Sequence, residues 1–137
     1  MANVYDRQVV EEGPRNAVVK LTGVLDSTDA SFVPVIALSD FTNNDKNLVL
    51  TGFRFNEVEY SISDPLGVTL SWMGTNPQTI VAIAGRGEIC AEEHGGLLPD
   101  TSRAGYTGDI QLSTTGFVIG KIANYTLILE LVKLYRA

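Results

Sequence analysis

The last fourteen residues, Asn124–Ala137, read NYTLILELVKLYRA and decide the fold. Counted in steps of two, both sides of this segment are apolar, with Leu127, Leu129, Leu131 and Tyr135 on one side and Ile128, Val132 and Leu134 on the other. A buried helix is the alternative, because Leu and Glu favour helices. No capping box precedes the segment, however, and such a helix would be apolar nearly all round. We therefore predict a strand over 126–136 that needs cover on both faces.

The middle of the chain alternates more simply. EVEYSIS (57–63) and VTLSW (68–72) each place apolar residues on one side and polar residues on the other. Between them lies DPLG (64–67), the residue set of a type I turn, with Gly67 available for the left-handed position of a bulge. This pattern predicts a hairpin with one face in water.

Other segments are apolar on both sides or nearly so. They are 16–26, 47–55, 79–85 and 116–122, and 31–38 joins them as an edge strand because Pro34 lacks a ladder donor. The segment 109–114 instead alternates between apolar and polar residues. Gly23 marks a bulge or a close approach. Turn residues recur about every 8–12 residues, which predicts an all-β sandwich or barrel of roughly eight to ten short antiparallel strands. We predict that residues 1–137 form a single domain and that 85–108 is one long loop.

Composition excludes several function classes. The net charge is −6 and the isoelectric point is near 4.6, so the chain has no basic stripe for nucleic acid. No uncharged apolar run is long enough to span a membrane, and charged residues stand where a signal peptide would be apolar. Cys90 is the single cysteine, so folding needs no disulfide. We expect synthesis and folding in a cytosol.

Candidate chemical sites are weak. Cys90, Glu92, Glu93 and His94 offer metal-ligating atoms, but no second cluster completes a structural site. No nucleophile motif surrounds a serine, and Gly85-Arg86-Gly87 lacks the third glycine and the βαβ frame of a dinucleotide loop. The acidic pairs Asp26 and Asp29, and Asp40 and Asp45, suit loop caps better than Ca²⁺ ligands. We expect no enzymatic activity, cofactor, metal or small-molecule substrate.

The apolar strands point to assembly. A small sandwich has one inner face per sheet, so strands that are apolar on both sides exceed what one domain can bury. We infer a permanent oligomer or a component of a protein lattice, whose interfaces resemble a domain core cut in half. The alternative is a monomeric barrel with large loops packed outside it.

Two stretches carry a resemblance to a known class of protein. VVEEGPRNAVVKLTGVLDSTD (9–29) and TLILELVKLYRA (126–137) resemble small β-rich virion structural proteins of tailed bacteriophages, most of all capsid decoration (cement) proteins. The resemblance implies a jelly-roll-like sandwich that trimerises and braces major capsid protein subunits. It also implies synthesis in the host cytoplasm and final residence on the capsid surface.

The resemblance further implies contact residues. Residues 1–16 become a candidate N-terminal arm and 85–108 a second arm, with polar anchors and apolar contacts at Arg7, Arg15, Arg86, Arg103, Leu134 and Tyr135. Two alternatives stay open. One is a tail, neck or collar component of the particle, and the other is a ligand- or carbohydrate-binding sandwich.

Overall fold

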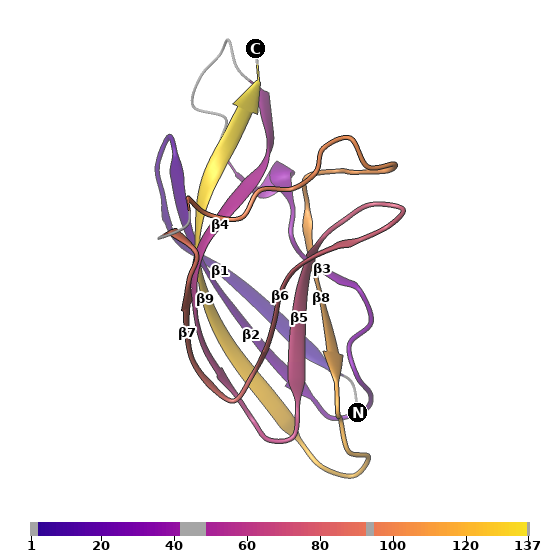
Figure 1. Cartoon of the computed structure of the whole chain (residues 1–137). Coiled ribbons are helices and arrows are strands. Elements are labelled where there is room, and N and C mark those ends of the chain that lie inside the picture. The colour runs from indigo at the N-terminus through magenta and orange to yellow at the C-terminus, as the bar shows by residue number, and fades with distance from the viewer. Residues whose placement is uncertain (1–2, 42–48, 93–94, 137) are drawn as a thin grey trace.

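The chain folds into two facing β-sheets (Figure 1). The structure is a computed structural model that describes residues 3–41, 49–92 and 95–136. In chain order the elements are β1 (Val4–Glu12), β2 (Asn16–Leu25), β3 (Val33–Ile36), the 3-10 turn η1 (Leu38–Asp40), β4 (Val49–Ile62), β5 (Gly67–Trp72), β6 (Gln78–Ala84), β7 (Arg86–Cys90), β8 (Ile110–Thr115) and β9 (Ala123–Arg136). The predicted all-β class is confirmed.

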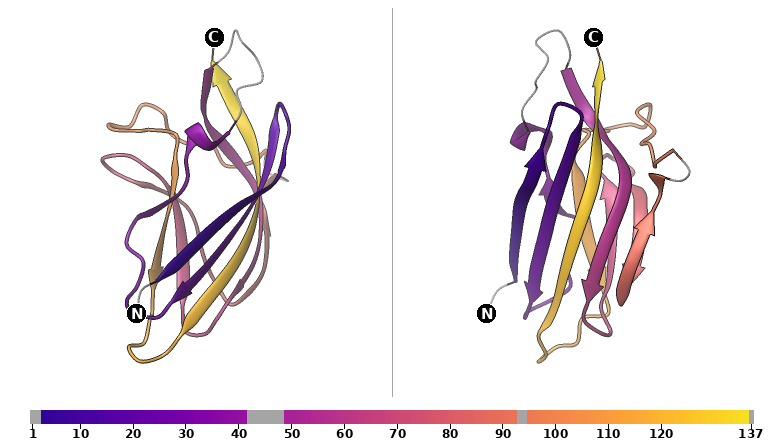
Figure 2. Two further views of the ribbon diagram at one scale, coloured as in Figure 1. Left: turned by 180° about the vertical axis from the view of Figure 1, so that it is seen from behind. Right: turned by 90° about the vertical axis from the view of Figure 1, so that its left-hand side faces the viewer.

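The strand order is that of a jelly roll. One sheet runs β1-β2-β9-β4-β7, which the right-hand view of Figure 2 shows face-on, and the other runs β3-β8-β5-β6. From β2 to β9 each connection crosses to the opposite sheet, except that β5 and β6 are neighbours within one sheet. Two four-stranded sheets connected in this way form a double-sheet jelly roll, to which β1 adds a fifth strand at one edge.

The C-terminal segment is the central strand of the larger sheet. The predicted strand is confirmed as β9, which pairs with β2 on one side and β4 on the other. Tyr125, Leu127 and Leu129 point inward and are buried, whereas Thr126, Ile128 and Glu130 alternate with them and are exposed. The expectation that this strand needs cover on both faces is therefore wrong for most of its length. The facing sheet buries one side, and the other side is largely polar.

The strands on either side of β9 also differ from the pattern seen in the sequence. The segments predicted over 47–55 and 57–63 join into one strand, β4, bent by irregularities near Gly52 and after Phe55. Residues 47 and 48 lie outside the described part of the chain. Strand β3 lies at the edge of its sheet, as Pro34 predicted.

The predicted hairpin over 57–72 is wrong. Both strands exist, but β4 and β5 belong to opposite sheets. The turn begins one residue earlier than predicted, because the amide of Leu66 donates to the carbonyl of Ser63 at 2.9 Å. The Asp64–Pro65 peptide bond is cis, so Pro65 occupies the third position of a type VI turn, and Gly67 has no positive φ. Leu66 is buried between the sheets, which explains why the chain crosses here instead of folding back.

Three other expectations need correction. Residues 116–122 form a loop between β8 and β9 instead of a strand. The predicted long loop 85–108 begins with β7, which pairs with β4. The candidate N-terminal arm is mostly β1, an edge strand that pairs with β2. In each case the backbone pairs, or fails to pair, in a way that local composition does not reveal.

Gly23 marks a close approach, one of the two roles predicted for it. It lies on β2 opposite Tyr125, whose ring occupies the space that a Cβ at this position would need. Burial, reinforced by the neighbouring phenol of Tyr5, raises the pKa of the Tyr125 phenol. The aromatic ring therefore packs over the glycine and takes the place of a side chain from β2.

We expect Gly23→Ala to lower the free energy of unfolding by about 1–3 kcal/mol, because the added methyl group overpacks the core against Tyr125. Gly13→Ala is the matched control, since the nearest atom to its added Cβ would be the carbonyl oxygen of Asn16 at 3.9 Å. That control should stay within about 0.5 kcal/mol of the wild type. Chemical denaturation followed by circular dichroism measures both, and equal stability of the two variants would contradict the packing described here.

Candidate functional site

Four glutamates gather on the outer face of the larger sheet. Glu57 and Glu59 come from β4, Glu88 from β7 and Glu130 from β9. The register places Glu57 opposite Glu130 and Glu59 opposite Glu88. Carboxylate oxygens of Glu57, Glu59 and Glu88 lie within 4.8 Å of one another. We call these four residues the acidic cluster.

Crowding of like charges shifts the protonation of this cluster. A hydrogen bond shared with Glu130 is the main cause that raises the pKa of Glu57, and the charges of Glu130 and Glu59 add to it. A hydrogen bond with Glu57 raises the pKa of Glu88. Two carboxylates at this separation resist simultaneous ionisation, so they retain a shared proton at higher pH than isolated carboxylates do.

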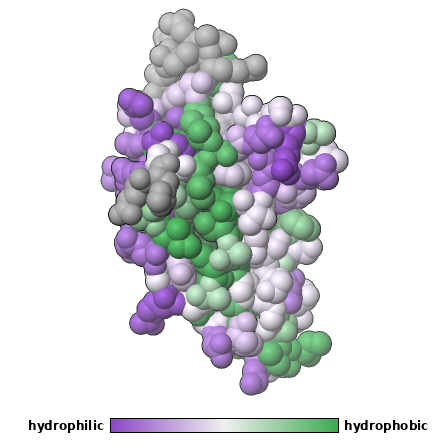
Figure 3. Space-filling view, in the orientation of Figure 1, coloured by the Kyte–Doolittle hydropathy of each residue, from purple (hydrophilic) through white to green (hydrophobic). Residues whose placement is uncertain are grey.

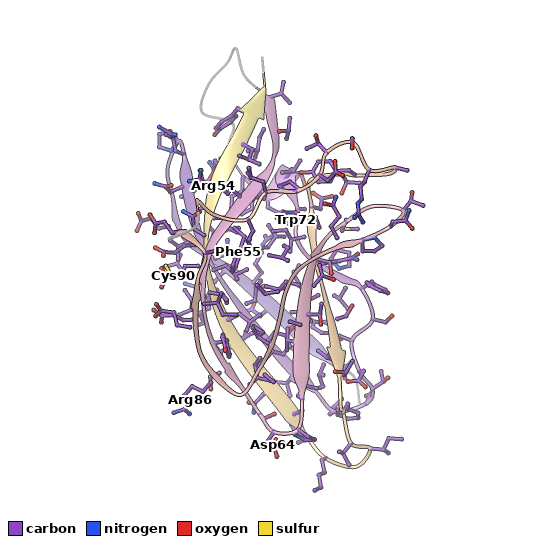
Figure 4. All side chains as sticks on the ribbon, in the orientation of Figure 1. Arg54, Phe55, Asp64, Trp72, Arg86 and Cys90 are labelled. Atoms are coloured by element: carbon purple, nitrogen blue, oxygen red, sulfur yellow. The ribbon has the colours of Figure 1, made fainter. Side chains whose placement is uncertain are left out.

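The acidic cluster borders two shallow hollows. One, of about 460 Å³, is lined by Glu59, Tyr60, Ser61, Arg86, Gly87, Glu88, Thr126 and Ile128. The other, of about 260 Å³, is lined by Val18, Glu57, Glu59, Ile128 and Glu130. Figure 4 shows Arg86 and Cys90 at opposite ends of β7 on this side of the molecule. Chemically, clustered carboxylates accept hydrogen bonds and are the ligand type that hard cations such as Ca²⁺ prefer.

A second feature is the loop between β8 and β9. Gly116 and Gly120 adopt positive φ angles of 87° and 88°, which favour glycine, and the amide of Lys121 donates to the carbonyl of Val118 at 3.1 Å. Asp29 anchors the loop, because its Oδ1 accepts hydrogen bonds from the amide of Phe117 at 3.1 Å and from Oγ1 of Thr114 at 3.0 Å. The start of the loop is therefore tied to the β2–β3 connection.

This anchored loop displays aliphatic side chains to the outside. Val118, Ile119 and Ile122, which we call the apolar tip, are 42%, 89% and 68% exposed. In Figure 3 an apolar patch lies at the lower end of the molecule, over the β8–β9 loop. The sequence had placed these residues inside a strand, where they would have been partly buried. The structure instead leaves them as the most exposed large hydrophobic group at this end.

The predicted contact residues are spread over the molecule, and three of them have partners within the chain. Arg7 forms an ion pair with Asp40. Arg103 lies 4.0 Å from the carboxylate of Asp100. The hydroxyl of Tyr135 donates to the carbonyl of Pro14 at 2.6 Å. Each of these three side chains therefore already has a partner within the chain.

The other predicted contact residues divide between the two ends. Arg15, in the β1–β2 turn, has an exposed side chain, while its carbonyl accepts from the amide of Lys133 at 2.6 Å near half-buried Leu134. Arg86 is exposed at the start of β7 and lines the larger hollow of the acidic cluster. The six residues thus form no single surface.

The candidate metal ligands also do not come together in one site. Cys90 is half-buried at the end of β7 and Glu92 is exposed, whereas Glu93 and His94 lie outside the described residues. Asp29 is a loop anchor, as predicted. Asp26 accepts a hydrogen bond from Oγ of Ser27 at 2.9 Å, Asp40 pairs with Arg7, and Asp45 is not described. Within the described residues, Glu57, Glu59 and Glu88 are the group close enough to share a cation.

The sequence predicted the exposure of part of the acidic cluster but not that its members lie together. The predicted wet face of 57–63 correctly included Glu57 and Glu59. Glu88 was placed in a loop and Glu130 in a strand of unknown partners, so no pattern in the sequence joined them. The pairing register of three strands that are distant in sequence brings these glutamates together. The sequence does not reveal that register.

Comparison with known proteins adds no family assignment, since no protein-family model, curated sequence or solved structure matches this chain. The described residues contain no helix with the length and apolar content needed to cross a lipid bilayer.

The raised pKa values predict a pH-dependent contribution to stability. The folded state holds protons on Glu57 and Glu88 more tightly than the unfolded chain does, so this contribution is full below the unfolded value near 4.5. It is lost as pH rises through the raised folded values. Glu57→Gln removes one charge from the acidic cluster, so its melting temperature should exceed that of the wild type at pH 7.5. The difference should narrow towards pH 4.

Asp6→Asn is the matched control, since Asp6 is an exposed acid on β1 of the same sheet, outside the acidic cluster. Thermal unfolding of the wild type and both variants across pH 4–8 checks the prediction. A gain for Asp6→Asn equal to that for Glu57→Gln would attribute the effect to net charge alone.

Proposed function

We propose that this chain is a non-enzymatic structural protein of a tailed-bacteriophage particle, a capsid decoration protein that braces major capsid protein subunits. The observation that carries the proposal is the anchored apolar tip. A protein that works alone in solution gains nothing from holding Ile119 and Ile122 in water, and exposed apolar groups of this kind mark interaction sites. The hydrogen bond from the amide of Phe117 to Asp29 holds the start of the loop before any partner arrives, which lowers the entropic cost of binding.

The shape of the tip favours a large partner with a groove. The β8–β9 loop lies at the extreme lower end of the sandwich (Figure 1), where neighbouring elements leave room for a second surface to approach. Lys121 is the one charged residue between Ile110 and Ile128, so the tip is nearly neutral although the chain is acidic. A groove between capsid subunits, lined with apolar side chains, is the complement that we propose.

The fold is compatible with this role. Double-sheet jelly rolls occur in viral capsid proteins, although they also occur in lectins and cupins, so the architecture alone does not select a function. The resemblance of residues 9–29 and 126–137 to phage virion proteins favours the first of these. The strands that looked apolar on both sides first suggested assembly. They are now weaker evidence for it, because most of their outward side chains are small or polar.

Heads of the phage that encodes this chain, assembled after deletion of its reading frame, provide the test. The purified protein should co-sediment with such heads at a fixed ratio to the major capsid protein. Ile119→Asp should weaken uptake by at least about tenfold, because it removes an aliphatic contact and places a charge in the groove. Asn76→Asp, in the exposed β5–β6 loop, is the control for added charge and should bind normally.

Three results would count against the proposal. Absence of uptake by heads would overturn it, and binding that appears only on tails or necks would move the protein to that part of the particle. Equal uptake of Ile119→Asp and the wild type would remove the apolar tip from the interface.

A further inference from the structure

Charge is distributed unequally between the two sheets. The strands β3, β5, β6 and β8 read VPVI, GVTLSW, QTIVAIA and IQLSTT, and none of these residues is ionisable. Every charged residue within a strand therefore lies in the other sheet, which also holds the acidic cluster. The smaller sheet is the neutral part of a chain whose net charge is −6.

Strand β6 is the unprotected edge of this neutral sheet. Natural edge strands are shortened, interrupted by Pro or supplied with charge, which prevents pairing with other chains. β3 is short and contains Pro34, β1 carries Asp6 and Arg7, and β7 carries Arg86 and Glu88. Beyond its first residues, β6 has no such protection against pairing with another chain.

Only the beginning of β6 is covered. Gln78 exchanges two side-chain hydrogen bonds with the backbone of Asp100, at 2.9 and 2.7 Å, and an irregularity in the pairing with β5 falls at Ile80. From Val81 to Ala84 the strand is regular and pairs with β5 on one side. Within the described residues no strand pairs with its other side.

Apolar surface lies beside this free edge. Figure 3 shows an apolar strip running down the middle of the molecule, between the edges of the two sheets. Val81 and Ile89, on β6 and β7, are half-buried, and Ala82 and Ala84 are exposed. A strand added to β6 would use its free backbone groups and cover part of this strip.

We infer that β6 pairs antiparallel with β6 of a second copy about a twofold axis, which joins two four-stranded sheets into one of eight strands. A second copy is the occupant that the charges favour, because two acidic chains repel except where a neutral edge lets them approach. An antiparallel edge pair is also self-complementary, as a twofold interface requires.

An antiparallel pair about a twofold axis joins like faces wherever the axis falls, and we place the axis at Ala82, because its side chain is small and points outward. Val81 and Ile83 lie opposite the core residues Leu70 and Val68, whereas Ala82 points outward opposite Thr69. With the axis at this position, Ala82 of one copy lies directly opposite Ala82 of the other. The small side chain leaves room for the two sheets to join without a clash. This inference rests on the sheet edge alone and does not depend on the proposed function.

Charge exchange at Ala82 tests the pairing. The wild type should have twice the chain mass by light scattering. Ala82→Lys and Ala82→Glu each place like charges opposite one another, so each variant should be a monomer, with dimer dissociation constants raised at least about tenfold. An equimolar mixture of the two should recover the doubled mass, which a misfolded variant could not do. Thr126→Lys, on the outer face of the other sheet, is the control and should stay dimeric.

The outcomes separate clearly. A monomeric wild type, or a mass of three copies, would overturn the twofold pair, and so would Ala82 variants that keep the wild-type mass. If both variants are monomeric and their mixture stays monomeric, Ala82 does not face Ala82 and the proposed register is wrong. Uptake by phage heads is measured separately, so failure there leaves this result unaffected.

Discussion

The pairing of β9 between β2 and β4 is the constraint on which the rest of the structure depends. Among the described residues, β9 is the strand that joins β1 and β2 to β4 and β7 in the larger sheet. Tyr125, Leu127 and Leu129 fill the inner face at this junction and are buried almost completely. Because β2 (Asn16–Leu25) and β9 (Ala123–Arg136) lie far apart in the chain, the sheet closes only after the C-terminal segment is available. Such non-local pairing is typical of slowly folding β-proteins.

The same register organises the surface. With Leu129 and Leu131 held inward, Glu130 must point outward, and the pairing with β4 places it beside Glu57. Near the end of β9 an inward position holds a charged residue instead of an apolar one. Lys133 is buried there and forms an ion pair with Glu12 at 2.7 Å, which ties the β1–β2 hairpin to β9. One outer face thereby becomes crowded with charge, while the opposite sheet has none. This asymmetry separates a face that repels copies of itself from an edge that can accept them.

Alternation in the sequence was enough to predict most strands and the sandwich, since a period of two reports which side of a strand is buried. Alternation failed where the structure depends on which strands pair with each other. The hairpin over 57–72 was wrong because strand patterns do not state whether a turn returns to the same sheet, and burial of Leu66 decided that it crosses. Residues 116–122 resembled a strand, but Gly116 and Gly120 bend the chain into a loop. The acidic cluster could not be predicted from the sequence, because it forms only through the pairing register of three strands.

Apolar surface left uncovered takes two different geometries here, and each suits a different partner. The apolar tip is a projection held at its base by Asp29, so a concave surface complements it. The edge of β6 that no described strand pairs with carries backbone donors and acceptors, so a second β6 can complement it. The two features lie on separate elements and need not compete. A chain that joins its own copies through one and a larger surface through the other can link neighbouring attachment points, which neither contact could do alone.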